Sequence, residues 1–325
     1  MPTFPGAHPV EVGSADEADP ITLSVHEAGT GDAVVFCHGF PDLAFGWRHQ
    51  LGAVAAAGFR AIAPDQRGCG RSSAPRGVSS YGLTELTGDL VGLLDALDIE
   101  QAFFIGHDWG GFVAWAMPVL HPERVRGVAG LCTPYMRFPS IEQHLSIVDG
   151  DADRQYVAWF QRPGTAEAEM DGNVETILTR IFRGGVPLTE ALEHAMASGS
   201  LDMNPFLDAA SWPVMGTPLC EPAEMAHYVA AFERSGFAGG VNWYRNIDRN
   251  ALEHPEIGRR DLAIPCLMLT AELDPGLRPE FADGMEQRIA DLTRHDLTGV
   301  GHWIQQEVPD VVTGHLIDWL GASCR

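Results

Sequence analysis

One aspartate stands at a sharp strand-to-helix turn. The segment Ile105-Gly106-His107-Asp108-Trp109-Gly110-Gly111 follows an apolar run typical of a buried strand and opens a run that predicts a helix. Glycines two residues before and two after Asp108 leave room for a strained backbone at the central position. An ionised carboxylate exposed there can attack a saturated carbon and form an ester. The alternative role for such an aspartate is to cap the helix.

A second turn could supply hydrogen-bond donors to this carboxylate. His38-Gly39-Phe40-Pro41-Asp42 follows another apolar run, Ala33–Cys37. We expect the backbone amides of Phe40 and Trp109 to form an oxyanion hole, and Phe40-Pro41 is a candidate cis peptide. An ordinary strand-to-loop turn is the alternative.

A base and an acid should follow the nucleophile along the chain. Of the 13 histidines, His302 lies in Gly299-Val300-Gly301-His302-Trp303, a glycine-flanked loop before the last predicted helix. Two carboxylates, Glu272 and Asp274, follow the strand predicted before it. We favour Asp274 because it stands farther into the loop, whereas Glu272 could form an ion pair or lie exposed. The strand before that ends at Leu131-Cys132-Thr133-Pro134 without an acid.

The elements that position these residues alternate along the chain. Short apolar runs predict strands, and leucines at helical spacing between 83 and 97 predict a helix. This alternation indicates an α/β fold with a mostly parallel sheet flanked by helices. From about 133 to 247 helical patterns alone are convincing, which predicts an inserted all-helical cap. We expect core at 1–133, cap at 134–247 and core at 248–325, with Met1–Pro20 as a polar lead-in. The strands are expected at 33–37, 60–63, 102–105, 128–131, 265–270 and 293–297, and a closing helix at 310–320.

Composition excludes several classes of function. The 325 residues carry a formal charge of −23, which disfavours nucleic acid as a partner. The apolar runs are too short to predict a membrane span. All 21 bases are arginine, so lysine-dependent Schiff-base and P-loop chemistry is excluded. The six cysteines lack zinc or redox spacing, and scattered thiols indicate a reducing, cytoplasmic location.

Four stretches of the chain resemble the α/β-hydrolase superfamily, and within it the soluble epoxide hydrolases. The resemblance runs from about Ile21 to Leu320. Two of these stretches, His38 to Pro41 and Gly106 to Gly111, are shared with haloalkane dehalogenases. The stretches are His38-Gly39-Phe40-Pro41, Asp65-Gln66-Arg67-Gly68, Gly106 to Gly111 and Gly301-His302-Trp303.

Two cap segments separate these families. Gln155 to Gly164 resembles the first tyrosine motif of epoxide hydrolases, and Phe232 to Phe237 with Asn242 to Asn246 resembles the second. The resemblance implies that Tyr156 and Tyr244 reach toward Asp108. An opening epoxide needs a proton for its oxygen, which phenols can donate, whereas a leaving halide does not. Local packing within the cap is the alternative role for both tyrosines.

The sequence therefore predicts an epoxide hydrolase that forms a vicinal diol through an ester on Asp108. His302 would be the base, Asp274 its orienting acid, and no metal or organic cofactor is needed. We expect an apolar small molecule, a bulky aryl or alkyl epoxide, as substrate and a monomer or homodimer. We expect five residues to contact the substrate: Phe40, Trp109, Met136, Trp159 and Trp303. For the apolar residues of the cap, which include Trp212, packing between the cap helices is the alternative role.

Two other functions stay open. The first is a haloalkane dehalogenase using the same triad, and the second is a non-catalytic small-molecule receptor on the same fold. The sequence departs from the family pattern at Asp42, where glutamate is common, at Cys69, where an aromatic residue is usual, and at Ala251, where tryptophan is common.

Overall fold

The computed structural model describes residues 4–13, 20–187, 189–190, 193, 203–211 and 214–324. Eight strands in this part of the chain form one sheet in the order β1-β2-β4-β3-β5-β6-β7-β8. The six strands from β3 to β8 pair in parallel, whereas β2 pairs antiparallel with both β1 and β4. The strands are β1 (Ala7–Glu11), β2 (Thr22–Ala28), β3 (Ala33–Cys37), β4 (Arg60–Asp65), β5 (Ala102–His107), β6 (Val125–Leu131), β7 (Leu262–Ala271) and β8 (Ile289–Leu297).

The mostly parallel sheet is confirmed, and all six strands expected from apolar runs are present. The prediction of a polar lead-in at Met1–Pro20 was wrong in one respect, because strand β1 lies within these residues. This strand buries only Val10 fully and exposes Ala7, Pro9 and Glu11. At an edge of the sheet a strand needs few apolar side chains, so its pattern was too weak to recognise.

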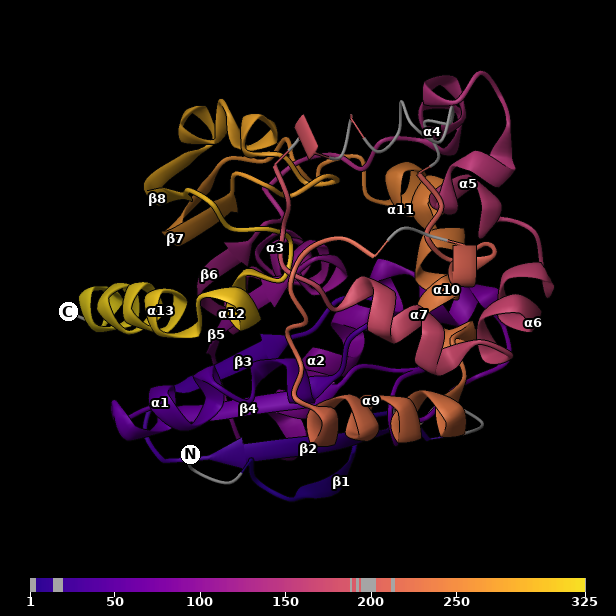
Figure 1. Cartoon of the computed structure of the whole chain (residues 1–325). Coiled ribbons are helices and arrows are strands. Elements are labelled where there is room, and N and C mark those ends of the chain that lie inside the picture. Colours follow the sequence, from indigo (N-terminus) through magenta and orange to yellow (C-terminus); the bar gives the residue numbers. More distant parts are fainter. Residues whose placement is uncertain are drawn as a thin grey trace.

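Helices cover both faces of the sheet (Figure 1). On one face α1 (Gln50–Ala56) and α13 (Pro309–Ser323) bury Leu51, Val54 and Leu316 in an apolar cluster with the strands. On the other face α2 (Leu83–Ala96) and α3 (Trp109–Leu120) belong to a second cluster. This second cluster continues into the residues between β6 and β7, so the sheet and the helices of that part of the chain share a core.

A block of helices lies in the chain between β6 and β7 and gathers beside one end of the sheet (Figure 1). Within its described residues the only β-type pairings are two isolated bridges. A short helix, α12 (Ile304–Glu307), follows β8 and precedes α13. The helices of the block are α4 (Ile141–Ile147), α5 (Tyr156–Trp159), α6 (Thr165–Asp171), α7 (Val174–Ile181), α9 (Pro222–Ser235), α10 (Ala238–Arg245) and α11 (Ile247–Glu253).

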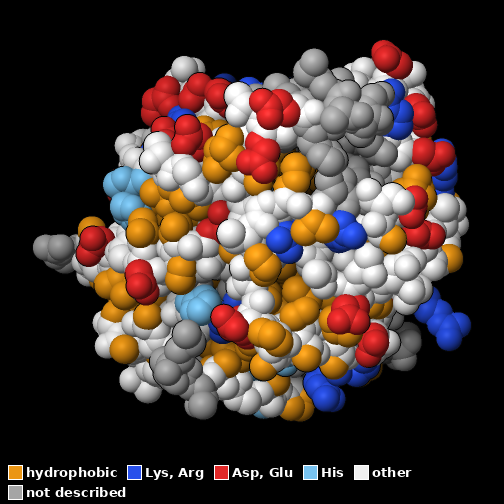
Figure 2. Space-filling view, in the orientation of Figure 1, with side chains coloured by type: hydrophobic (Ala, Val, Ile, Leu, Met, Phe, Trp, Pro, Cys, Tyr) orange, Lys and Arg blue, Asp and Glu red, His pale blue; other side chains and the backbone are white. Residues whose placement is uncertain are grey.

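The surface reflects the negative charge of the chain. Figure 2 shows acidic side chains gathered over the end of the molecule that holds β7 and β8. Exposed Glu280, Asp283 and Glu286 belong to the short turns between these two strands. Among the residues that the structure describes, no helix is both long enough and apolar enough to cross a membrane.

Candidate active site

Asp108 occupies the strained turn that the glycine pattern predicts. Its backbone angles are φ 52° and ψ −124°, between the end of β5 and the first residue of α3. A Cβ on Gly106 would lie 2.1 Å from the Gly110 carbonyl oxygen, and one on Gly110 would lie 2.0 Å from that of Cys37. Side chains at either position would therefore open the turn, and glycine is required at both.

Donors at the carboxyl edge of the sheet hold the Asp108 carboxylate. The Phe40 amide donates to Asp108 Oδ1 at 2.8 Å, and the Phe40-Pro41 bond is cis as expected. Burial raises the pKa of Asp108, while the charge of His302 and the amides of Phe40 and Trp109 lower it. Both amides of the expected oxyanion hole thus act on the carboxylate, and they favour its ionised form.

His302 lies between two carboxylates. Its Nδ1 is 2.7 Å from Asp274 Oδ2, and its Nε2 is 3.8 Å from Asp108 Oδ2. Burial lowers the pKa of His302, but the charge of Asp274, its hydrogen bond and the charge of Asp108 raise it to about 9. Burial raises the pKa of Asp274, but His302 and the amides of Gly276 and Leu277 outweigh it and bring it to about 2. The structure therefore brings the three expected triad residues together.

Other polar groups near His302 support the loop. Glu272 accepts a hydrogen bond from the Gly299 amide at 2.7 Å, so it is a loop brace, and Asp274 is the carboxylate that contacts the histidine. His107, Cys132 and His302 place nitrogen and sulfur atoms within 4.8 Å of one another. However, His107 Nε2 and Cys132 Sγ lie 2.8 and 3.3 Å from the His302 carbonyl oxygen, to which both donate. These atoms carry hydrogens, and the cluster is a support for His302 rather than a set of metal ligands.

Tyr156 and Tyr244 lie beside each other, and the charge of Asp108 acts on both phenols. Tyr156 begins α5 and Tyr244 lies near the end of α10, with ring centroids 5.7 Å apart. Burial raises the pKa of each phenol, and the negative charge of Asp108 raises it further. Gln161 fixes their relative position because its side-chain amide donates to carbonyl groups on both helices, those of Val157 and Tyr244.

An aromatic wall surrounds Phe40 on the side of the cap. The ring centroids of Tyr244, Phe160 and Phe206 lie 5.6, 5.8 and 5.9 Å from the ring centroid of Phe40. The ring of Phe206 also lies 5.6 Å from that of Tyr156. Sequence reasoning missed Phe206, because it belongs to no motif and only the fold of the cap brings it to the tyrosines.

The expected substrate contacts fall into two groups. Phe40 and Trp109 line the site, because the Trp109 ring lies 5.0 Å from Tyr244. Trp303 lies 5.1 Å from the His302 ring and donates its indole hydrogen to the Ile181 carbonyl at 2.7 Å. The structure brings neither of the other two to the triad: Trp159 is buried in the cap against Phe160, and Met136 is half-buried against the core. Trp212 lies outside the described residues.

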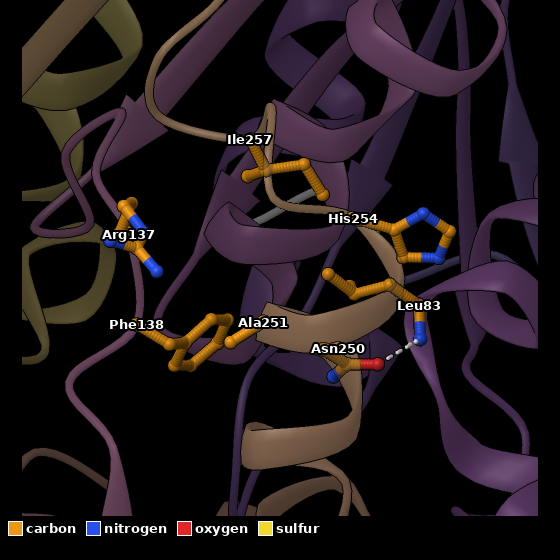
Figure 3. Close-up of a pocket in the computed structure, with 7 residues that line it drawn as sticks. All are labelled: Leu83, Arg137, Phe138, Asn250, Ala251, His254 and Ile257. Carbon is orange, nitrogen blue, oxygen red and sulfur yellow. Dashed lines mark hydrogen bonds between the residues drawn. The ribbon is translucent and has the colours of Figure 1, made fainter.

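A recess lies between α11 and the core, and Figure 3 shows its lining. No triad residue lines it. Ala251 lines it, and Asn250 accepts a hydrogen bond there from the Leu83 amide at 2.9 Å. Phe138 borders the recess and also packs 4.8 Å from Trp109. Ala251, where the sequence departs from the family pattern, thus lies in this recess and not at the triad.

Comparison with known proteins gives consistent matches. A family described as alpha/beta hydrolase fold matches residues 32–309. "Epoxide hydrolase A" of Mycobacterium tuberculosis is 37% identical, over 94% of this chain and 95% of that protein. "Bifunctional epoxide hydrolase 2" of Sus scrofa is 38% identical over 94% of this chain, but the match spans only 54% of that longer protein.

Comparison with solved structures gives matches of the same kind. The crystal structure of Epoxide Hydrolase A from Mycobacterium thermoresistibile is 39% identical, with a TM-score of 0.84 over 97% of this chain and 98% of that one. An epoxide hydrolase from an endophytic Streptomyces is 32% identical, also with a TM-score of 0.84, over 97% and 96% of the two chains. The resemblance in sequence therefore extends to the whole arrangement of sheet and helices.

Proposed function

The chain belongs to the epoxide hydrolases of the α/β-hydrolase fold, and from this we propose that it converts an epoxide and water into a vicinal diol through an ester on Asp108. The observation that carries the proposal is the position of the Asp108 carboxylate. It has the Phe40 amide on one oxygen, His302 near the other, and two phenols on whose pKa its charge acts. A carboxylate nucleophile and proton donors for a departing oxygen are what epoxide opening needs.

In the first half-reaction Asp108 opens the ring. Oδ1 is held by the Phe40 amide, so Oδ2 is the oxygen that attacks the epoxide carbon. The carbon–oxygen bond of the epoxide breaks, and its electron pair stays on the epoxide oxygen. Tyr156 and Tyr244 hold this oxygen and one of them protonates it, which leaves a hydroxyalkyl ester on Asp108. Their raised pKa keeps both phenols protonated until that moment.

In the second half-reaction His302 activates water. Ester formation removes the negative charge of Asp108, which is one of the causes that raise the pKa of His302. The pKa then falls and the imidazole becomes free to take a proton from water. The water oxygen adds to the Asp108 carbonyl carbon while the amides of Phe40 and Trp109 hold the oxyanion. The intermediate collapses, His302 passes its proton to the leaving oxygen, and the diol departs. The proton left on the Asp108 carboxyl replaces the one that the tyrosine gave up, which restores the Asp108 carboxylate and the neutral phenol.

We further propose that the helices between β6 and β7 act as a cap, because they carry both tyrosines. The cytoplasmic location stays a prediction, which the free state of all six cysteines supports. A monomeric or homodimeric state stays a prediction as well. The apolar rings of Phe40, Phe160 and Phe206 around the tyrosines favour an apolar epoxide.

A panel of aryl and alkyl epoxides and matched haloalkanes tests the reaction type. We expect diol formation from epoxides and no halide release above background, because two phenols face the position of the leaving oxygen. The readouts are chromatography of the diol and a halide electrode. Halide release without diol formation would assign the chain to the dehalogenase reaction instead. Tight binding of both classes without turnover would favour the receptor.

Removing either phenol should slow ring opening. Tyr156→Phe and Tyr244→Phe each keep the ring and its packing and delete one hydroxyl, so we expect single-turnover epoxide opening to slow by about 10- to 10³-fold. The matched control is Tyr135→Phe, which deletes a phenol bonded to the Arg260 carbonyl at 2.9 Å in the core. If the double variant Tyr156→Phe/Tyr244→Phe opens epoxides at the wild-type rate, the tyrosines only pack the cap.

A further inference from the structure

A buried carboxylate lies behind the site and takes no part in the proposed chemistry. Asp42 is fully buried, two residues after the Phe40 amide of the oxyanion hole. Its Oδ1 accepts hydrogen bonds at 2.8 Å from the Leu43 amide and from the hydroxyl of Tyr228 on α9. Its Oδ2 lies 3.5 Å from the side-chain amide nitrogen of Gln305. A charged group held in this way joins a cap helix to the core.

The hydrogen bonds continue from Gln305 to the catalytic loop. Gln305 Nε2 donates to His107 Nδ1 at 3.2 Å, and His107 Nε2 donates to the His302 carbonyl at 2.8 Å. A carbonyl can only accept, so the hydrogen of His107 is on Nε2 and its Nδ1 is a bare acceptor. Burial and the charge of His302 lower the pKa of His107 to about 3, which keeps it neutral. Each hydrogen bond in the series from Asp42 to His302 therefore has a fixed donor and a fixed acceptor.

A second route joins the same cap helix to the same loop. The Tyr228 ring packs 4.4 Å from Phe182, and Phe182 packs 4.5 Å from Trp303, the residue after His302. Arg48 of the core also pairs with Glu224 on α9 at 2.6 Å. The position of α9 is thus coupled to the His302 loop both by ring packing and by hydrogen bonds.

We propose that Tyr228 and Asp42 are positioning residues through which the seated cap helix α9 holds His302 in place, by way of Gln305 and His107. The proposal rests on the function proposed above. It assigns the pair an effect on ester hydrolysis, which uses His302 as the base. Ring opening depends on Asp108 and the two tyrosines, so it should be nearly independent of this chain of bonds.

The negative charge of Asp42 decides which groups donate and which accept along this series of hydrogen bonds. Burial raises the pKa of Asp42 to about 7, while the Leu43 amide, the Tyr228 hydroxyl and the charge of Arg48 oppose the rise. Without the Tyr228 hydroxyl the carboxylate loses a donor and binds a proton more readily. A protonated Oδ2 would face the Gln305 donor with its own hydrogen. Gln305 would then turn away, and the bond to His107 would be lost.

The test separates the two half-reactions. In Tyr228→Phe the ring contact with Phe182 is kept and only the hydroxyl is lost. With enzyme in excess over epoxide, rapid quenching and protein mass spectrometry follow formation and decay of the ester. We expect decay to slow by about tenfold and formation to stay within about twofold of wild type. The control is Tyr81→Phe, which removes a buried phenol bonded to the Pro75 carbonyl at 2.8 Å, and should change neither rate.

A double-mutant cycle tests whether Tyr228 and Asp42 act through the same series of hydrogen bonds. Asp42→Asn places an amide donor opposite Gln305, so it should slow ester decay at least as much as Tyr228→Phe. Adding Tyr228→Phe should then have almost no further effect. Wild-type ester decay in Tyr228→Phe, an equal slowing of both half-reactions, or additive effects would each overturn the proposal. A wild-type enzyme that makes diol without any ester would instead refute the function on which it rests.

Discussion

Replacement of Asp108 by alanine will abolish diol formation. No other carboxylate lies where the amides of Phe40 and Trp109 and the base His302 converge, among the residues that the structure describes. The variant should fold, because the residue ends a turn and its removal relieves the burial of a charge. We expect a loss of at least about 10⁴-fold in kcat/KM, typical of removing a covalent nucleophile.

The measurement pairs turnover with folding. Diol is followed by chromatography, and thermal unfolding shows whether the fold persists. Asp296→Ala is the control, since it removes a carboxylate on β8 that bonds Thr270 at 2.7 Å, and it should keep wild-type turnover. With excess enzyme in heavy-oxygen water, the wild-type protein should take up the label at Asp108 while the first diol stays unlabelled. Near-normal diol formation by Asp108→Ala would end the assignment of the nucleophile.

His302→Gln should stop turnover after one chemical step. Asp108 and both tyrosines are intact in this variant, so the epoxide opens and the ester forms. Glutamine cannot take a proton from water, so the ester persists and the mass of the protein rises by one substrate. Steady-state diol formation should fall by at least about 10³-fold.

The control for this variant is another histidine on the same sheet. His295 of β8 stacks on His315 of α13 at 4.1 Å, away from the triad, and His295→Gln should turn over normally. Intact protein mass spectrometry after mixing with epoxide reports the ester directly. If His302→Gln binds the epoxide and shows neither ester nor diol, the division of labour between Asp108 and His302 is wrong.

The residues that local patterns predict best are those at turns. Around Asp108 the chain needs glycine at fixed positions, so the sequence itself carries the geometry. The central strands β3, β5 and β6 are equally clear, because they are almost wholly buried and mostly apolar. The choice between Glu272 and Asp274 is less local, because it depends on which carboxylate the His302 loop meets in space.

The polar chain behind the site could not be predicted. Asp42, His107, Tyr228 and Gln305 come from four separate parts of the sequence, and no local pattern links one of them to another. Only packing in three dimensions turns them into one line of donors and acceptors. The same holds for Phe206, which reaches Phe40 and Tyr156 only through the fold of the cap.

The place of the helical block in the chain also sets the order of folding. β6 ends at Leu131, and its neighbour β7 begins at Leu262, so residues 132–261 must be accommodated before these strands can pair. Closing such a long loop costs entropy before any contact is gained, and contacts between distant residues form slowly. Until then β6 is an unprotected apolar edge that can recruit another chain. Asp108 follows β5, whereas Asp274 and His302 follow β7 and β8, so the proposed triad is complete only when the last strands join the sheet.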